Sequence, residues 1–190
     1  MDQKKRDVRK GIIVLYILIT AVFLCLCGGY FIIDTYYPLK YEDLVSKYAD
    51  AHGMEREFVC AVIATESKFS TNTKSGKGAV GLMQIMPQTA EWVGGKLGID
   101  DVSEESLKDP ETNIRIGTWY LKFLLDRYEN ADTAAAAYNA GHGNVDKWLA
   151  NKDYSDDGET LKDIPFEETK KYVKKVKRAY EIYKKIYSLY

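Results

Sequence analysis

At 190 residues, 46% of them hydrophobic, the chain is long enough for one globular domain with a hydrophobic core. Beyond its first ten residues it carries 22 basic and 26 acidic side chains, a net charge of −4, which argues against nucleic acid as the main partner. The two histidines are too few for most metal sites, and neither a zinc-type cluster, a phosphate-binding glycine loop nor a calcium loop is present. We therefore expect no metal and no cofactor.

The N-terminus has the composition of a membrane anchor. Residues 1–10 contain five basic side chains, and residues 11–33 form an uncharged, apolar stretch. As a helix this stretch is about 34 Å long, enough to cross a hydrocarbon core of about 30 Å. The basic residues before it and Asp34 after it favour a cytoplasmic N-terminus. We predict a cytoplasmic tail at 1–10, a transmembrane helix at 11–33, a short tether at 34–44 and an external domain at 45–190.

A cleaved signal peptide is the alternative for this segment, because a basic start and an apolar run also describe one. The run is longer than the usual apolar core of a signal peptide, and no Ala-x-Ala site follows it. Small residues at Cys27 and Gly29 could still serve a peptidase. The anchor is the preferred interpretation, and secretion after cleavage is the alternative.

From residue 41 onward the sequence predicts helices joined by short loops. Apolar periodicity and stop signals place helices at 41–51, 55–67, 88–97, 110–128, 134–140, 144–150 and 166–190. Asp109 followed by Pro110 is a strong helix start, and Asp132 or Thr133 is expected to cap the alanine-rich helix. Residues 78–87 read as an extended segment or a tight turn. The fold class is mainly α, with at most a small β element around 81–85.

Four short motifs follow one another along the external domain. They are Ala-Thr-Glu-Ser at 64–67, Gly-Ala-Val-Gly-Leu-Met-Gln-Ile-Met-Pro at 78–87, Ala-Tyr-Asn-Ala-Gly at 137–141 and Ile-Pro-Phe-Glu-Glu-Thr-Lys-Lys-Tyr-Val at 164–173. In sequence and order they resemble the motifs of the soluble lytic transglycosylase (SLT) domain, and the resemblance spans about 45–185. It implies a goose-type lysozyme-like helical fold and peptidoglycan glycan strands as the substrate.

Glu66 is the candidate catalytic residue. It stands at the end of an apolar helix and just before a polar loop, where a carboxyl can be half-buried and keep its proton near neutral pH. Such an acid can protonate a leaving glycosidic oxygen. The resemblance implies that one glutamate protonates the bond between N-acetylmuramic acid and N-acetylglucosamine. It then takes the proton of the C6 hydroxyl, so that a 1,6-anhydro ring closes without water.

Residues within the motifs are expected to support Glu66 or bind the glycan. Tyr138 can offer its phenol to the Glu66 carboxyl, or it can be a core aromatic. Asn139 suits either sugar hydroxyls or the helix end before Gly141. By resemblance, Gln84 faces the glycan-binding groove. Ser67 either hydrogen-bonds the substrate or caps the helix that ends there.

Three further residues are expected near the glycan. Met86 is expected to form an apolar wall for a sugar face, with core filling as the alternative. Ser75 stands where the family often has a serine that positions the N-acetyl group. By resemblance, Glu168 braces or binds near the catalytic region. Its alternative is a solvated pair with a neighbouring lysine of the last helix.

These residues lead to the hypothesis of a membrane-anchored, extracytoplasmic lytic transglycosylase. A hydrolytic lysozyme of the same fold and a non-catalytic cell-wall binding module are the alternatives. The partners expected are peptidoglycan glycan strands and, through the N-terminal helix, the membrane. The short tether adds the hypothesis of a partner in the cell-wall synthesis or secretion machinery.

Overall fold

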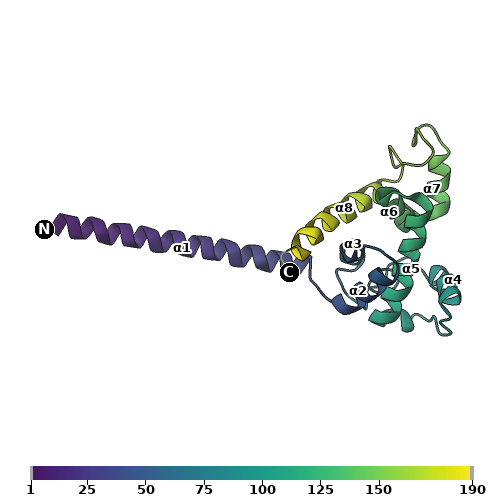
Figure 1. The fold of residues 1–190 in the computed structure, drawn as a ribbon, viewed down its shortest axis with the longest axis horizontal. Coiled ribbons are helices and arrows are strands. Elements are labelled where there is room, and N and C mark those ends of the chain that lie inside the picture. The colour runs from purple at the N-terminus through teal and green to yellow at the C-terminus, as the bar shows by residue number, and fades with distance from the viewer. Residues whose placement is uncertain (1, 189–190) are drawn as a thin grey trace. The chain divides into compact units, whose positions relative to one another are not determined.

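The structure is a computed structural model that describes residues 2–188, with the side chains of 2–5, 30 and 32 left aside. The chain divides into two compact units, one ending at Pro38 and the other beginning at Leu39. The first unit is the helix α1 (Asp2–Tyr36), and the second holds seven α-helices and one short 3-10 helix within the described range. The mainly α fold class predicted from the sequence is confirmed (Figure 1).

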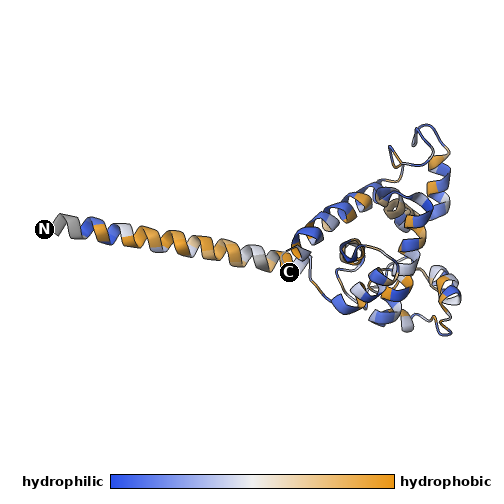
Figure 2. Ribbon diagram, viewed as in Figure 1, coloured by the Kyte–Doolittle hydropathy of each residue, from blue (hydrophilic) through white to orange (hydrophobic). Residues whose placement is uncertain are grey.

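Helix α1 contains the predicted transmembrane segment 11–33. Within its residues Arg6–Tyr36 an 18-residue window reaches a mean hydropathy of 2.7, and the segment is long and apolar enough to cross a membrane. A continuous hydrophobic stretch covers the middle of α1 in Figure 2. A signal sequence near an N-terminus would meet the same criteria of length and composition, so the choice between anchor and signal peptide stays a prediction. The helix includes residues 34–36, which the sequence had placed in the tether.

The second unit is built around α3 (Arg56–Glu66), in which every side chain from Phe58 to Ala64 is buried. Helix α3 packs along the amphipathic α8 (Glu167–Tyr187) and against α2 (Glu42–Ala51). Helix α5 (Pro110–Tyr128) contacts α2, α4 (Pro87–Leu97), α6 (Ala131–Ala140) and the 3-10 helix η1 (Ser106–Lys108). Helix α7 (His142–Leu149) packs on α6.

The helix starts follow from their caps. The Asp109 carboxylate accepts a hydrogen bond from the backbone N–H of Thr112 at 2.8 Å, with Pro110 in the first helical position, as the sequence predicted. The predicted cap of the alanine-rich helix was wrong, because α6 begins at Ala131. Its cap is Asn130, whose amide oxygen accepts from the Thr133 backbone N–H at 2.9 Å. Asn130 has the extended backbone that a cap requires, which leaves Asp132 and Thr133 inside the first turn.

The expected small β element is a tight turn rather than a strand. Val80 and Ile85 exchange two backbone hydrogen bonds of 3.0 Å, and Val80 also forms an isolated bridge with Lys74. No β-strand is present in the part of the chain that the structure describes. This bridged segment, residues 80–85, is called the Val80–Ile85 turn below. It follows the loop after α3 and precedes α4, and it faces the end of α3 where Glu66 lies.

Candidate active site

Glu66 is the last residue of α3, and its carboxyl is half-buried. Burial raises the pKa of Glu66 to about 7, because the ionised carboxylate loses hydration there. The Tyr172 phenol opposes this effect and lowers the pKa, since it stabilises the charged form. No other carboxyl in the described part of the chain contributes to the shift. Glu66 is therefore an acid that keeps its proton to higher pH than an exposed glutamate does.

Tyr172 of α8 brings a buried hydroxyl to this carboxyl. Burial, and then the charge of Glu66, hold the pKa of Tyr172 well above 10, so its phenol stays protonated and can only donate to the carboxylate. Among residues 2–188 the Tyr172 oxygen has no partner at full hydrogen-bond geometry, so its contact with Glu66 is a loose one. Catalytic hydrogen bonds are often loose without substrate and tighten when it binds. This role of Tyr172 was not predicted from the sequence, although the fourth motif, residues 164–173, contains the residue.

Tyr138 of α6 lies near Glu66 but does not hydrogen-bond to it as expected. Its hydroxyl donates to the backbone carbonyl of Met83 at 2.8 Å. A phenol has one proton to give, and the Met83 carbonyl in the Val80–Ile85 turn takes it. Burial and then the charge of Glu66 raise the pKa of Tyr138 well above 10, which shows that the two groups still interact. Tyr138 therefore positions the turn beside the acid.

Ser67 and Gln84 use their polar groups within the protein. The buried Ser67 hydroxyl contacts the carbonyls of Ile63 at 3.3 Å and Leu82 at 2.7 Å, so it caps α3 and fastens it to the turn. The Gln84 side-chain amide donates to the backbone carbonyls of Thr73 and Gly81, both at 2.9 Å. The proton of Ser67 and the amide N–H groups of Gln84 are thus directed at backbone carbonyls. These contacts agree with the capping alternative for Ser67 and support a positioning role for Gln84, and the substrate contacts expected of both residues stay a prediction.

Asn113 of α5 is a second positioning residue that the sequence analysis did not identify. It is fully buried, and its amide oxygen accepts from the Met83 backbone N–H at 2.8 Å. Its amide nitrogen donates to the carbonyls of Val80 at 3.0 Å and Leu107 at 2.7 Å. The available signal was an asparagine beside apolar helix positions, since a buried amide needs such partners. Asn113 thus connects α5 to the turn at Val80 and at Met83.

Gly81 lets the Val80–Ile85 turn approach Asn113. Its φ of +82° lies in the region that favours glycine. A Cβ at this position would lie 2.2 Å from the Asn113 amide nitrogen and 2.3 Å from the Leu107 carbonyl oxygen. Only glycine therefore fits between these two groups, and the turn's path beside Glu66 depends on it.

The remaining predicted site residues occupy exposed or half-buried positions. Met86, just before α4, is 41% exposed and available to an apolar ligand face. The Ser75 hydroxyl oxygen accepts from the Ala79 backbone N–H at 2.9 Å, which leaves its own proton for another acceptor. The Asn139 side-chain oxygen accepts from the Thr169 hydroxyl at 2.7 Å and joins α6 to α8. Glu168 is exposed and lies 3.6 Å from the Lys77 ammonium.

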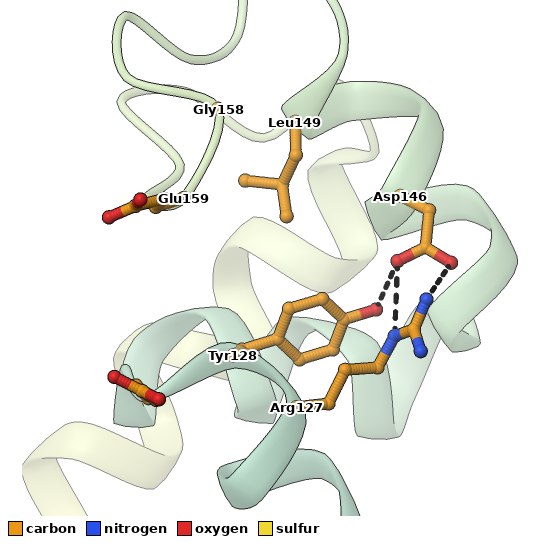
Figure 3. Close-up of a pocket in the computed structure, with 7 residues that line it drawn as sticks. Arg127, Tyr128, Asp146, Leu149, Gly158 and Glu159 are labelled. Carbon is orange, nitrogen blue, oxygen red and sulfur yellow. Dashed lines mark hydrogen bonds and ion pairs between the residues drawn. The ribbon is translucent and has the colours of Figure 1, made fainter.

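A separate cavity of about 430 Å³ lies between the C-terminal end of α5, α7 and the loop 151–166 (Figure 3). Asp146 accepts from the Arg127 guanidinium at 2.8 Å and from the Tyr128 hydroxyl at 2.8 Å. None of the predicted site residues lines this cavity. Within residues 2–188, moreover, no group of three histidine, cysteine or acidic side chains is placed to hold a metal ion.

The fold and the site define a class: a helical domain that presents one half-buried glutamic acid beside a tight turn that requires Gly81. Residues 43–160 match the family model of the Transglycosylase SLT domain, and the chain therefore belongs to this family. The family resemblance read from the four motifs is confirmed.

Relatives agree with this assignment. The chain is 41% identical over 150 residues to the soluble lytic murein transglycosylase of Salmonella typhimurium, a match that covers 77% of this chain and 23% of that protein. It is 36% identical over 118 residues to the membrane-bound lytic murein transglycosylase C of Serratia proteamaculans, covering 56% of this chain and 32% of the relative. The chain thus spans about a quarter to a third of the length of these relatives.

A solved structure shows the same fold. The lytic transglycosylase Slt of Pseudomonas aeruginosa, solved as an inactive mutant with glutamine in place of a glutamate, superposes with a TM-score of 0.73 at 35% identity. The match covers 82% of this chain and 26% of that protein. The lysozyme-like fold expected from the sequence is confirmed by this similarity.

Proposed function

We propose that this chain is a membrane-anchored lytic transglycosylase that cuts peptidoglycan glycan strands with Glu66 as its only catalytic residue. The observation that carries the proposal is the lone carboxyl of Glu66, whose pKa of about 7 results from burial. Family membership supports the reaction class, and relatives are named as lytic murein transglycosylases. That a relative was solved as an inactive glutamate-to-glutamine mutant supports a glutamate as the essential group.

The first step uses Glu66 as an acid. As the bond between C1 of N-acetylmuramic acid and the O4 of N-acetylglucosamine breaks, the leaving oxygen takes the Glu66 proton. The substrate's own N-acetyl group stabilises the positive charge that develops at C1. A second protein carboxylate is not needed for this step, which agrees with a Glu66 pKa that no other carboxyl perturbs.

The second step uses the same residue as a base. Ionised Glu66 takes the proton of the C6 hydroxyl, whose oxygen forms a bond to C1 and closes the 1,6-anhydro ring. The proton lost in the first step is thus regained, and no water is consumed. A pKa of about 7 suits both steps, because an acid and base whose pKa lies near the operating pH transfers protons in both directions at low cost. The Tyr172 phenol stabilises the carboxylate between the two steps.

The surrounding residues divide into two groups in this proposal. Met86, Ser75, Asn139 and Glu168 are proposed to contact sugar or its N-acetyl and lactyl groups, which their exposed or half-buried positions allow. Tyr138, Ser67 and Gln84 hold the Val80–Ile85 turn in place. We expect variants of the first group to change KM. We expect variants of the second group to change both the activity and the free energy of unfolding.

A hydrolytic lysozyme remains the rival reaction, since water could attack C1 in place of the C6 hydroxyl. Mass spectrometry of peptidoglycan digested by the full-length chain in detergent separates the two. Anhydro-muramic ends support the proposal, whereas reducing ends heavier by one water support hydrolysis. The control is Glu66→Gln, which keeps the shape of the side chain and removes the proton donor. Equal digestion by the two proteins would mean that Glu66 is not the catalytic residue, and no digestion by either would favour a wall-binding module.

The membrane part of the proposal rests on α1 and on the membrane-bound relative. Only residues 37–41 separate α1 from α2, and five residues span at most about 18 Å when extended. The domain would therefore act on glycan next to the membrane, close to cell-wall synthesis or secretion machinery. Protease treatment of intact protoplasts should remove the C-terminal domain and leave α1 protected. Full protection of the domain would contradict this topology, and release of the domain without added protease would indicate signal cleavage.

A further inference from the structure

Partly exposed aromatic rings gather where α4 packs on α5. The Trp92 ring meets the Phe123 ring edge-on at 5.1 Å and the Trp119 ring edge-on at 5.5 Å between centroids. Trp119 and Phe123, one turn apart on α5, have nearly parallel rings 6.0 Å apart. Trp92 is 41% exposed, and the other two side chains are half-buried. Trp92, Trp119 and Phe123 are called the aromatic ridge below.

The ridge is connected to the candidate active site through Tyr120. The Tyr120 ring lies 6.2 Å from Trp92 and 6.3 Å from Phe123, and on its other side it lies 5.6 Å from Tyr138. These contacts place the Trp92 ring within about 12 Å of the Tyr138 ring. Tyr138 holds the turn beside Glu66 and feels the charge of that carboxyl. A glycan strand of a few sugar units could therefore extend from Glu66 to the exposed Trp92 ring.

The polar groups of the ridge are free for a ligand. Neither the Trp92 nor the Trp119 indole N–H has a hydrogen-bond acceptor among residues 2–188, and Trp92 is exposed. A ring with an apolar face and an unused donor at its rim matches a sugar, which has apolar C–H faces and hydroxyls around its edge. Contiguous exposed rings on a soluble domain commonly mark a binding surface.

Part of the positive charge near the ridge is already engaged within the protein. On α5, Lys122 pairs with Asp126, and Arg127 pairs with Asp146. Arg115, one turn before Trp119, donates to the Leu97 carbonyl, and Lys96 on α4 is exposed. A polyanion would need such cations to replace its counterions. Stacking of sugar faces on the rings needs no such row of cations.

We infer that the aromatic ridge binds the glycan strand at sugar units distant from the bond that Glu66 cleaves. This inference rests on the proposed function and adds a second binding region to it. The ridge would hold long strands by stacking and leave the reacting sugars to the residues around Glu66. Affinity should therefore increase with the number of sugar units until the strand reaches Trp92.

The test measures glycan binding by the full-length chain in bilayer discs, with Glu66→Gln as the parent so that the strand stays intact. Chitin-type and peptidoglycan-derived oligomers of increasing length are titrated by calorimetry. Adding Trp92→Ala should weaken binding of the longest oligomer about tenfold, a loss of about 1.4 kcal/mol. The weakening should shrink as the oligomer is shortened. Trp92→Phe should restore most of the affinity, because phenylalanine keeps a flat face.

Trp92→Leu separates stacking from packing. Leucine on α4 still packs against α5 but has no flat ring. The variant should therefore fold like the parent and bind long strands more weakly than the parent does. The matched control is Phe166→Ala, which removes a ring of similar exposure, 49%, that also packs edge-on, 5.0 Å from Trp148. Phe166 has no ring contact with Tyr138 or Tyr120 among the described residues, and its removal should leave the length dependence unchanged.

Several outcomes would overturn the inference. The inference is wrong if Trp92→Ala and Trp92→Leu bind long strands as tightly as the parent does. It is also wrong if the variants lose the same affinity for oligomers of every length. A tryptophan emission shift on transfer from detergent to bilayer discs that Trp92→Ala abolishes, with glycan affinity unchanged, would assign the ridge to the membrane surface instead. If the wild type releases anhydro ends while these variants bind normally, the ridge fails and the proposed function stands. If the parent binds no oligomer of any length and the wild type leaves peptidoglycan uncut, both fail.

Discussion

The buried phenol of Tyr172 on α8 contacts the carboxyl of Glu66 at the end of α3. Burial raises the pKa of Glu66, and Tyr172 lowers it, so the value of about 7 is the balance of two opposing effects. The close packing of α3 on α8 brings these residues together. The acid strength of Glu66 therefore depends on a contact between the two helices, and it can be changed without altering Glu66 itself.

The pH dependence of the reaction should follow the protonation of Glu66. In the free enzyme the carboxyl must carry its proton, so kcat/KM should fall as the pH rises above about 7, approaching tenfold per pH unit. The measurement is the initial rate on peptidoglycan fragments between about pH 3.5 and 9 at low substrate concentration. A basic limb with its midpoint near 4.5, the ordinary value for glutamate, would show that Glu66 is not buried in the working enzyme.

Replacing Tyr172 by phenylalanine should move this basic limb to higher pH. The phenol stabilises the carboxylate, so its loss leaves the effect of burial unopposed and raises the pKa of Glu66 above about 7. The maximal rate should fall, because the carboxylate formed during the reaction loses its donor. A merely structural role for Tyr172 would lower activity at every pH and leave the midpoint in place.

Tyr138→Phe is the matched control for that variant. Tyr138 also has a buried phenol near Glu66, but its proton goes to the Met83 carbonyl. Its removal should cost about 1–3 kcal/mol of stability by leaving that carbonyl without its donor, and shift the basic limb less than Tyr172→Phe does. Equal shifts in the two variants would contradict the assignment of Tyr172 as the residue that tunes the acid.

Glu66→Gln should stabilise the protein at alkaline pH. The folded-state pKa of Glu66, about 7, exceeds its ordinary value of 4.5, so the folded chain binds the proton more tightly than the unfolded chain. The favourable contribution is complete below about pH 4.5 and is lost as the pH rises through 7, where burial of the charge costs on the order of 3 kcal/mol. Glutamine has no such cost. Urea unfolding at pH 5 and pH 9 measures it, and a Glu66→Gln effect that is the same at both values would contradict the argument.

The sequence was sufficient for the helices and for the position of Glu66. Apolar residues at helical spacing predicted α3 within one residue at each end, and the Asp109–Pro110 start of α5 has the geometry expected of it. These features depend on neighbours in the chain. The half-burial of Glu66 follows from the same local pattern, an apolar helix that ends where a polar loop begins.

The partners of the polar side chains could not be predicted in the same way. Tyr138 was expected to donate to Glu66 and instead donates to the backbone carbonyl of Met83, 55 positions away. Every residue has such a carbonyl, so the sequence does not single out Met83 as the acceptor. Ser67 and Gln84 likewise bond to backbone carbonyls. A backbone acceptor leaves no mark in the sequence, so the choice between binding substrate and fixing a turn requires the folded positions.

Asn113→Ala tests how far the Val80–Ile85 turn depends on α5. The variant removes one hydrogen bond to the Met83 N–H and two to the carbonyls of Val80 and Leu107, all buried. Unsatisfied buried groups should lower the free energy of unfolding by about 3 kcal/mol, which for a domain of this size is roughly 9 °C in Tm. Because Met83 also accepts from Tyr138, the looser turn should reduce kcat even well below Tm.

Thr118→Val is the control for Asn113→Ala within the same helix. Thr118 is also fully buried on α5 and touches Met83, but only through a 4.0 Å contact between its hydroxyl and the Met83 sulfur. Valine keeps the shape and removes a weak hydrogen bond, so the loss should stay within about 1 kcal/mol. Asn113→Asp should keep the acceptor for the Met83 N–H and lose both donors, and it should recover stability as the pH falls, since a protonated carboxyl can donate once. If Asn113→Ala and Thr118→Val unfold at the same temperature, the amide is not what holds the turn beside Glu66.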